Sequence, residues 1–175
     1  MSLLYDVFET PLGWVGALAS TKGLRRTTLP QSSPEECIVL LGDKVNQADQ
    51  DPGRFQHLNA DLQHSLSGQA VGLDEDLDLD DAAPFFKAAW EACLSIPYGH
   101  TRTYRWLAIQ AGSPLAVRAA GQAMARNRLP LVVPCHRVIG SDGRLCGFGS
   151  EARQLDLKQA LLNIEAGAVP SPEAA

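Results

Sequence analysis

The sequence predicts an α/β N-terminal domain, made of a small antiparallel sheet plus helices, followed by a mainly helical winged helix-turn-helix domain. Three observations predict this fold class. Apolar residues near the N-terminus lie between turn signals as in strands, later apolar residues recur at helical spacing, and the charge changes sign between the two halves. A chain of 175 residues with 45% hydrophobic residues can bury a core, which excludes disordered and collagen-like classes.

The charge is divided unevenly between the two halves. Residues 1–84 carry five basic and fourteen acidic side chains, net −9, whereas residues 85–165 carry ten basic and five acidic ones, net +5. Glu173 completes the total of −5. Because DNA phosphates are bound by Lys and Arg, only the second half is suited to a nucleic-acid partner, and we expect the first half to face away from a duplex.

Residues 1–83 are predicted to form the N-terminal scaffold domain. Its expected elements are two or three antiparallel strands over 3–30 with turns at 11–13 and 21–23, a helix beginning at Ser33-Pro34, and a helix over 55–66. The acidic segment 74–81 reads DEDLDLDD and is expected to be a solvated linker or an exposed edge. An acidic mimic of nucleic acid is the alternative, but nothing else in the sequence supports it.

Residues 84–166 are predicted to form the second domain, followed by a flexible tail over 167–175. Its expected elements are helices over 84–96, 104–111 with Thr103 as cap, 113–126 and 154–164, and a small β wing within 137–148. Two short helices joined by Ala111-Gly112-Ser113 have the outline of a helix-turn-helix. No apolar run is long enough to span a membrane, so we expect a cytoplasmic monomer, nucleoid-associated if bacterial, with no membrane partner.

Four cysteines occur, at 37, 93, 135 and 146, without metal-ligand spacing, so we expect reduced thiols and neither metal nor cofactor. Cys37 and Cys93 fall in apolar helical patterns and are predicted to be core residues. Cys135 lies between Pro134 and His136, where a neighbouring base is expected to lower the thiol pKa and favour a nucleophile. A buried cysteine at a strand end explains the same spacing, so the residues alone leave both interpretations open.

The segment Pro134-Cys135-His136-Arg137-Val138 resembles the active-site signature of the O6-alkylguanine-DNA alkyltransferases, the methylated-DNA–protein-cysteine methyltransferases. The resemblance covers about residues 84–166. Further matching segments follow in the family's order: Ile96-Pro97-Tyr98-Gly99-His100-Thr101, Tyr104, Leu107-Ala108, Ala111-Gly112, Arg118-Ala119-Ala120-Gly121, Ala123-Met124, Asn127 and Ile139-Gly140-Ser141-Asp142-Gly143. The N-terminal half resembles the family's α/β domain only in size, placement and strand content.

The resemblance implies a single-turnover repair protein for double-stranded DNA containing O6-alkylguanine, and possibly O4-alkylthymine. Cys135 would accept the alkyl group and thereby inactivate the protein. His136 would take the thiol proton, Glu165 would orient the imidazole, and Asn127 would shape the Cys135 loop.

The resemblance also implies a DNA interface and a base pocket. Tyr104 would help to rotate the target nucleotide, and Arg118 would fill the vacated position in the base stack. The small residues of the same helix would allow close approach to the minor groove. The implied DNA-binding residues are Tyr104, Arg118, Ala119, Ala120, Gly121, Arg126 and Arg128. The implied pocket residues are Pro130, Val138, Phe148, Gly149, Ser150 and Lys158.

Two departures from the family pattern stand out. The spacing from Phe148 to Lys158 is about three residues longer than usual, and Arg128 replaces a common proline.

Three alternative functions are a sensor of alkylated DNA that does not react, a winged-helix regulator, and a cysteine hydrolase. The acceptor cysteine disfavours the sensor, Ala119 to Gly121 offer a regulator no base-reading side chains, and no oxyanion hole is recognisable for a hydrolase.

Overall fold

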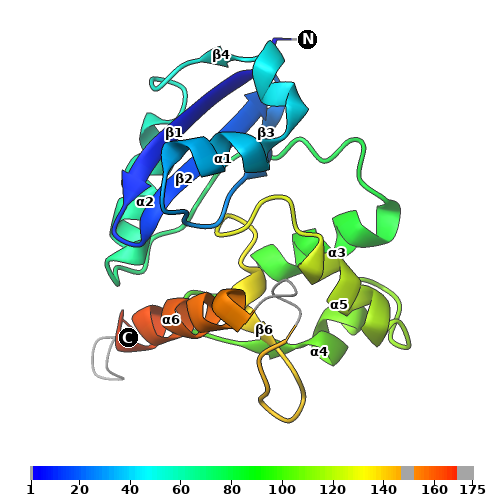
Figure 1. The fold of residues 1–175 in the computed structure, drawn as a ribbon. Coiled ribbons are helices and arrows are strands. Elements are labelled where there is room, and N and C mark those ends of the chain that lie inside the picture. The colour runs from blue at the N-terminus through cyan, green and yellow to red at the C-terminus, as the bar shows by residue number, and fades with distance from the viewer. Residues whose placement is uncertain (1, 147–151, 169–175) are drawn as a thin grey trace. The chain divides into compact units, whose positions relative to one another are not determined.

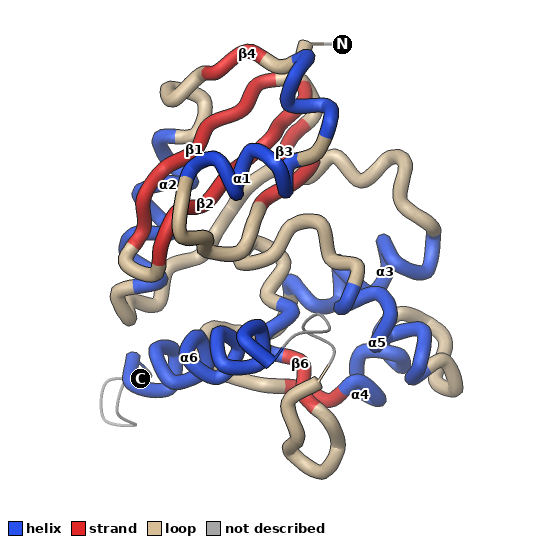
Figure 2. The backbone as a smooth tube through the Cα atoms, in the orientation of Figure 1, coloured by secondary structure: helices blue, strands red, loops and turns tan. Residues whose placement is uncertain are grey.

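A computed structural model describes residues 2–146 and 152–168. The chain forms two compact units. The first contains the residues up to Ser67, Val71–Asp80 and Arg128–Val132, and the second contains Gly68–Ala70, Asp81–Asn127 and the chain from Val133 onward. Figure 2 shows the longer strands in the first unit and mostly helices in the second. No sequence signal indicated that residues 128–132 belong to the first unit.

The first unit is built on a four-stranded mixed sheet in the order β3-β2-β1-β4. Its strands are β1 (Leu4–Thr10), β2 (Gly13–Ser20), β3 (Gly23–Thr27) and β4 (Asp49–Gln50) (Figure 1). The first three strands pair antiparallel through the two predicted turns. The short β4 pairs parallel with β1, which the sequence did not predict.

The helical elements of the first unit are α1 (Pro34–Leu41), η1 (Asp43–Gln47) and α2 (Gln56–Leu66). The predicted start of α1 is confirmed, because the Ser33 hydroxyl accepts a hydrogen bond from the Glu36 N–H at 3.3 Å. α1 crosses in front of the sheet in Figure 1. Leu18 of β2 packs there with Leu41 and Val45, which joins the helical segment to the sheet in one apolar cluster.

The acidic segment 74–81 lies along the edge of β3. The Leu24 N–H donates to the Asp76 carbonyl, and the Asp78 N–H donates to the Leu24 carbonyl, both at 2.8 Å. The Asp78 carboxylate is buried and accepts hydrogen bonds from Ser20 at 2.6 Å and from Arg25 at 2.7 Å. Part of this segment is therefore a paired edge with a buried ion pair, and it covers backbone groups that β3 would otherwise expose.

Three helices form the body of the second unit: α3 (Pro84–Leu94), α4 (Tyr104–Gln110) and α5 (Val117–Ala125). Thr103 caps α4 as predicted, accepting from the Trp106 N–H at 3.1 Å. The indole N–H of Trp90 donates to the Ala123 carbonyl at 2.8 Å and joins α3 to α5. The predicted start of α5 at 113 is wrong: the Ala116 N–H closes a separate turn on the Ser113 carbonyl, and the helix begins after it.

The remaining elements of the second unit are β5 (Arg102–Thr103), η2 (Cys135–Arg137), β6 (Val138–Ile139) and α6 (Ala152–Ala168). β6 pairs in parallel with β5, and residues 140–144 form a tight turn. Up to residue 146 the predicted wing is therefore a loop after a parallel pair rather than a hairpin. α6 is longer than predicted and includes the first two residues of the expected tail, whose residues 169–175 lie outside the described part.

Residues 128–132 are held by the first unit through hydrogen bonds from β3. The Thr27 N–H donates to the Arg128 carbonyl at 2.9 Å, and the Thr27 hydroxyl donates to the Pro130 carbonyl at 2.7 Å. Among the described residues other than glycine, Leu131 alone has a positive φ, 73°. A left-handed backbone costs an L-residue about 1–2 kcal/mol, so this segment keeps its shape because its surroundings impose it.

Candidate active site

Cys135 begins η2, immediately after Pro134, and its side chain is almost fully buried. Burial raises the pKa of the Cys135 thiol, because the charged thiolate loses its solvation, while a hydrogen bond with Asn127 and the charge of Lys158 act in the opposite direction. The net direction is upward, so the sequence-based expectation of a lowered pKa is wrong. The thiol is protonated in the resting protein, and a nucleophilic sulfur requires a base to remove that proton.

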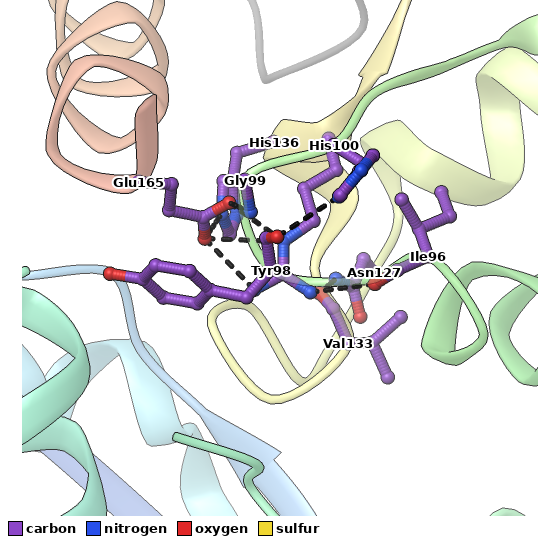
Figure 3. Close-up of polar contacts among 9 residues, drawn as sticks. Ile96, Tyr98, Gly99, His100, Asn127, Val133, His136 and Glu165 are labelled. Carbon is purple, nitrogen blue, oxygen red and sulfur yellow. Dashed lines mark hydrogen bonds and ion pairs between the residues drawn. The ribbon is translucent and has the colours of Figure 1, made fainter. Parts of the chain in front are cut away.

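Asn127 follows α5 and binds the chain that leads into the cysteine turn. Its amide Nδ2 donates to the Val133 carbonyl at 2.9 Å (Figure 3), and its side chain also contributes a hydrogen bond to Cys135. One side chain thus binds both the residue two positions before the cysteine and the thiol itself. The role of Asn127 in shaping the Cys135 loop stays a prediction.

The imidazole of His136 is buried and paired with Glu165. Its Nε2 lies 2.6 Å from the Glu165 Oε1 (Figure 3). Hydrogen bonds from His136 and Arg137 outweigh the effect of burial on the Glu165 carboxyl and lower its pKa to about 2, so it is ionised and can only accept. Nε2 therefore carries the proton of the neutral imidazole, and Nδ1 is the basic nitrogen.

The protonation state of His136 follows from its surroundings. Burial lowers the pKa of His136, and the charges of Arg137 and Lys158 act in the same direction, whereas Glu165 raises it. Because the Glu165 charge is already shared with Arg137, the net direction is downward and the imidazole is neutral at neutral pH. Its Nδ1 is buried without a hydrogen-bond partner among the described residues, so its lone pair is available to accept a proton.

Arg137 links the Glu165 carboxylate to the chain just after α3. Its guanidinium donates to both oxygens of Glu165 at 2.9–3.1 Å and to the Ile96 carbonyl at 2.8 Å, and it lies over the Tyr98 ring at 5.4 Å. The Gly99 N–H adds a further donor to Glu165 at 3.2 Å. No site role was predicted from the sequence for Arg137 or Gly99. Their positions inside the Pro-Cys-His-Arg-Val and Pro-Tyr-Gly-His segments were the available signal.

Lys158 of α6 is fully buried and is surrounded by oxygen atoms. Its Nζ donates to the Val138 carbonyl at 2.6 Å and to the Cys146 carbonyl at 2.8 Å, and it lies 3.4 Å from the Tyr104 hydroxyl. The Tyr104 hydroxyl itself donates to the Cys146 carbonyl. Burial raises the pKa of Tyr104 and lowers that of Lys158. Tyr104, which the sequence assigned to the DNA interface, therefore lies in one polar cluster with Val138 and Lys158, which it assigned to the base pocket.

α5 carries most of the residues that the sequence assigned to DNA. Arg118 is exposed, and within residues 2–146 and 152–168 no hydrogen bond or ion pair holds its guanidinium. Ala119 and Gly121 are half-buried, and a Cβ at Gly121 would meet nothing within 4 Å. Ala120 is fully buried, so its side chain packs inside the unit and cannot contact DNA.

Other predicted residues lie elsewhere. Arg126 is exposed at the end of α5, with its guanidinium 5.9 Å from the centre of the Phe86 ring. Arg128 belongs to the first unit, where its Nη2 donates to the Asp78 carbonyl at 2.9 Å, and Pro130 is buried in the same segment. Phe148, Gly149 and Ser150 lie outside the described residues.

In the part of the chain that the structure describes, no group of His, Cys, Asp and Glu is placed to hold a metal ion. No helix there combines the length and the apolar character needed to cross a membrane.

The fold and the site define a two-unit protein in which one unit holds a buried cysteine, a buried histidine–glutamate pair and a candidate DNA-binding helix. A family model described as the DNA binding domain of 6-O-methylguanine DNA methyltransferase matches residues 84–167. A methylated-DNA–protein-cysteine methyltransferase of Methanosarcina barkeri is 35% identical over 163 residues, which are 93% of this chain and 97% of the relative. The one described as constitutive in Bacillus subtilis is 35% identical over 161 residues, 92% and 94% of the two chains.

Solved structures agree with these relatives. Mycobacterium tuberculosis O6-methylguanine methyltransferase matches with a TM-score of 0.79 and 31% identity over 98% of each chain. The structure of Mycobacterium tuberculosis OGT in complex with DNA matches with a TM-score of 0.76 and 33% identity over 96% of each chain. The chain belongs to the family of methylated-DNA–protein-cysteine methyltransferases.

Replacement of the Glu165 carboxylate by an amide, Glu165→Gln, is expected to lower the free energy of unfolding by about 3 kcal/mol. The substitution leaves the Arg137 charge without its buried counter-ion. Urea unfolding at neutral pH measures the loss, and Glu91→Gln, an exposed position on α3, is the control that should change little. Equal losses in the two variants would contradict the assigned ion pair.

Proposed function

We propose that this protein repairs DNA by transferring the alkyl group of O6-alkylguanine directly and irreversibly to Cys135. The observation that carries the proposal is the buried pair of His136 and ionised Glu165, which leaves Nδ1 of the residue after the cysteine as an unpartnered base. Membership in the methyltransferase family supplies the substrate class. Each molecule reacts once, because the thioether product is stable.

The reaction forms one bond and breaks one. The sulfur of Cys135 attacks the alkyl carbon on O6, a carbon–sulfur bond forms, and the carbon–oxygen bond breaks with its electron pair on guanine. His136 Nδ1 receives the thiol proton, through a water molecule, and Glu165 stabilises the resulting imidazolium. The departing guanine anion gains one proton, the equivalent of the one that His136 received from the thiol, so the reaction balances without a further co-reactant.

DNA is bound through the helical unit in this proposal. α4 and α5 act as a helix-turn-helix, and α5 enters the minor groove, where the small side chains of Ala119 and Gly121 allow close approach. Arg118 occupies the position of the extruded base, because it is exposed at the start of α5 and no described contact holds it. Extrusion of a stacked base costs a few kcal/mol, which a side chain that fills the gap partly offsets.

The alternatives from the sequence are less well supported. A sensor that does not react has no use for a buried cysteine next to an oriented base, and the relatives named above are described as methyltransferases. A winged-helix regulator requires polar side chains on the reading helix, and the exposed part of α5 offers few of them.

Incubation with duplex DNA that carries isotopically labelled O6-methylguanine is expected to transfer one labelled methyl group per protein, located on Cys135 by peptide mass spectrometry. Cys135→Ala should accept no label, and Cys93→Ala, which removes the other deeply buried thiol of the same unit, should still accept it if it folds. Label in Cys135→Ala would refute the assigned acceptor.

The pH dependence of single-turnover transfer is expected to follow the lowered pKa of His136. The neutral imidazole is the active form, so the rate should stay constant between about pH 8 and 6.5, the ordinary value of histidine, and should fall only below it. Rapid-quench rates across this range test the expectation. His136→Gln should react slowly, and its rate should lack the fall at low pH. A midpoint above 6.5 would contradict the neutral, buried base.

Removal of the Arg118 side chain, Arg118→Ala, is expected to slow repair of duplex DNA about tenfold, which corresponds to ~1.4 kcal/mol of the extrusion energy. Reaction with free O6-benzylguanine, which needs no extrusion, should change less than about twofold. Lys87→Ala removes an exposed charge from α3 and serves as the control. If both substrates lose rate equally, Arg118 does not have the proposed role.

A further inference from the structure

The segment 128–132 is fastened to the first unit at three points. The Thr27 N–H and hydroxyl bind the carbonyls of Arg128 and Pro130, and the Arg128 guanidinium binds the Asp78 carbonyl at 2.9 Å. We refer to Thr27, Asp78 and Arg128 as the Thr27 clamp. It joins the end of β3, the acidic segment and the chain that leads to Cys135 within one unit.

Two residues of the clamp, Thr27 and Asp78, are held firmly in place. Thr27 is only 4% exposed and Asp78 only 2% exposed. The Asp78 carboxylate is fixed by Ser20 and Arg25, and its N–H is fixed by the Leu24 carbonyl. The carbonyl that accepts from Arg128 is therefore anchored in the sheet edge by bonds on its own side chain and backbone.

The clamped segment has a conformation that it would not adopt alone. Leu129 is fully buried and Leu131 is 5% exposed with a φ of 73°. A left-handed conformation in a leucine persists where neighbouring contacts impose it. The bonds to the carbonyls of Arg128 and Pro130 lie directly before Leu131, where they can impose this turn of the chain.

The segment ends next to the reactive cysteine. Only Val133 and Pro134 separate it from Cys135, and proline removes one backbone freedom from this connection. On the other side, Asn127 precedes the segment and binds the Val133 carbonyl. The cysteine turn thus begins two residues after a segment that is held at both ends, and a shift of residues 128–132 would displace the start of that turn.

We infer that Thr27, Asp78 and Arg128 are positioning residues for alkyl transfer, which place Cys135 by holding residues 128–132. The inference rests on the proposed function and gives the N-terminal unit a role in it. It also assigns a role to Arg128, the position at which this chain departs from the proline of its family. Arg128 was predicted from the sequence to bind DNA, and the two roles lead to different results with a substrate that contains no duplex.

The test measures single-turnover reaction with free O6-benzylguanine in the absence of DNA, with the full chain. The concentration dependence separates binding of the base from the first-order transfer step. Thr27→Val removes the hydroxyl donor at nearly constant shape, and Arg128→Ala removes the guanidinium. Both are expected to slow the transfer step by about tenfold or more, because small displacements of reacting groups are costly in rate.

Conservative substitutions at the same two positions should restore the transfer rate. Thr27→Ser keeps the hydroxyl and Arg128→Lys keeps a donor for the Asp78 carbonyl, and both should recover the transfer rate to within about threefold of the unchanged protein. Arg26→Ala is the matched control, because Arg26 is an exposed arginine of the same strand whose described hydrogen bond goes to Leu40. It should react at the rate of the unchanged protein.

Three results would overturn the inference. The first is an unchanged transfer rate in Thr27→Val. The second is an Arg128→Ala protein that reacts normally with the free base but binds duplex DNA weakly, which would make Arg128 a phosphate contact. The third is a loss of stability in urea with an unchanged rate per active molecule, counted by the labelled end point, which would make the clamp purely structural. Failure of the unchanged protein to react would instead refute the proposed function.

Discussion

The rest of the helical unit depends on the hydrogen bonds and ion pairs of the buried Glu165 carboxylate. α6 carries it, and its hydrogen-bond donors come from His136 and Arg137 in η2 and from Gly99 after α3. A buried carboxylate is tolerated only where enough donors replace its lost water, and here they do so to the extent that its pKa falls to about 2. Three segments distant in sequence are therefore fixed around one charge, which also sets the tautomer of the base.

Burial shifts the pKa values of Cys135 and His136 in opposite directions, and both shifts favour the neutral form. It raises the pKa of Cys135 and lowers the pKa of His136, so both are neutral at rest. A resting thiolate would react with any small electrophile, and a protein that reacts once cannot recover from such a loss. In the proposed reaction, a neutral thiol and a neutral imidazole confine the thiolate to the moment of transfer. The sequence suggested an activated thiol because it shows that Cys135 is next to His136. It does not show that the thiol is buried.

Local signals in the sequence predicted local structure well. The caps at Ser33 and Thr103 and the turns between the first three strands need only neighbouring residues, and the structure confirms them. Pro114 misled because a proline fits the first position of a helix and of a turn equally well. The resemblance brought His136 and Glu165 together correctly, but it gave no indication of Arg137.

Contacts between segments that are distant along the chain could not be predicted from the sequence. The parallel β4, the β5–β6 pair and the return of residues 128–132 to the first unit depend on pairings that no local pattern specifies. For the acidic segment, composition predicted exposure correctly for Asp74 and Asp76. It failed for Asp78, whose burial depends on Ser20 and Arg25 more than fifty residues away.

The sign of a segment's charge does not say which of its charges can reach DNA. Of the ten basic residues between 85 and 165, Arg137 and Lys158 serve the buried site and Arg128 serves the first unit. Exposed arginines remain at the start and end of α5, and these can neutralise phosphates. Arg118 is distinct among these because no described contact holds it, whereas Arg126 lies over an aromatic ring. Three of the ten basic residues are therefore engaged inside the protein, and affinity for the duplex depends on the basic side chains that remain at the surface.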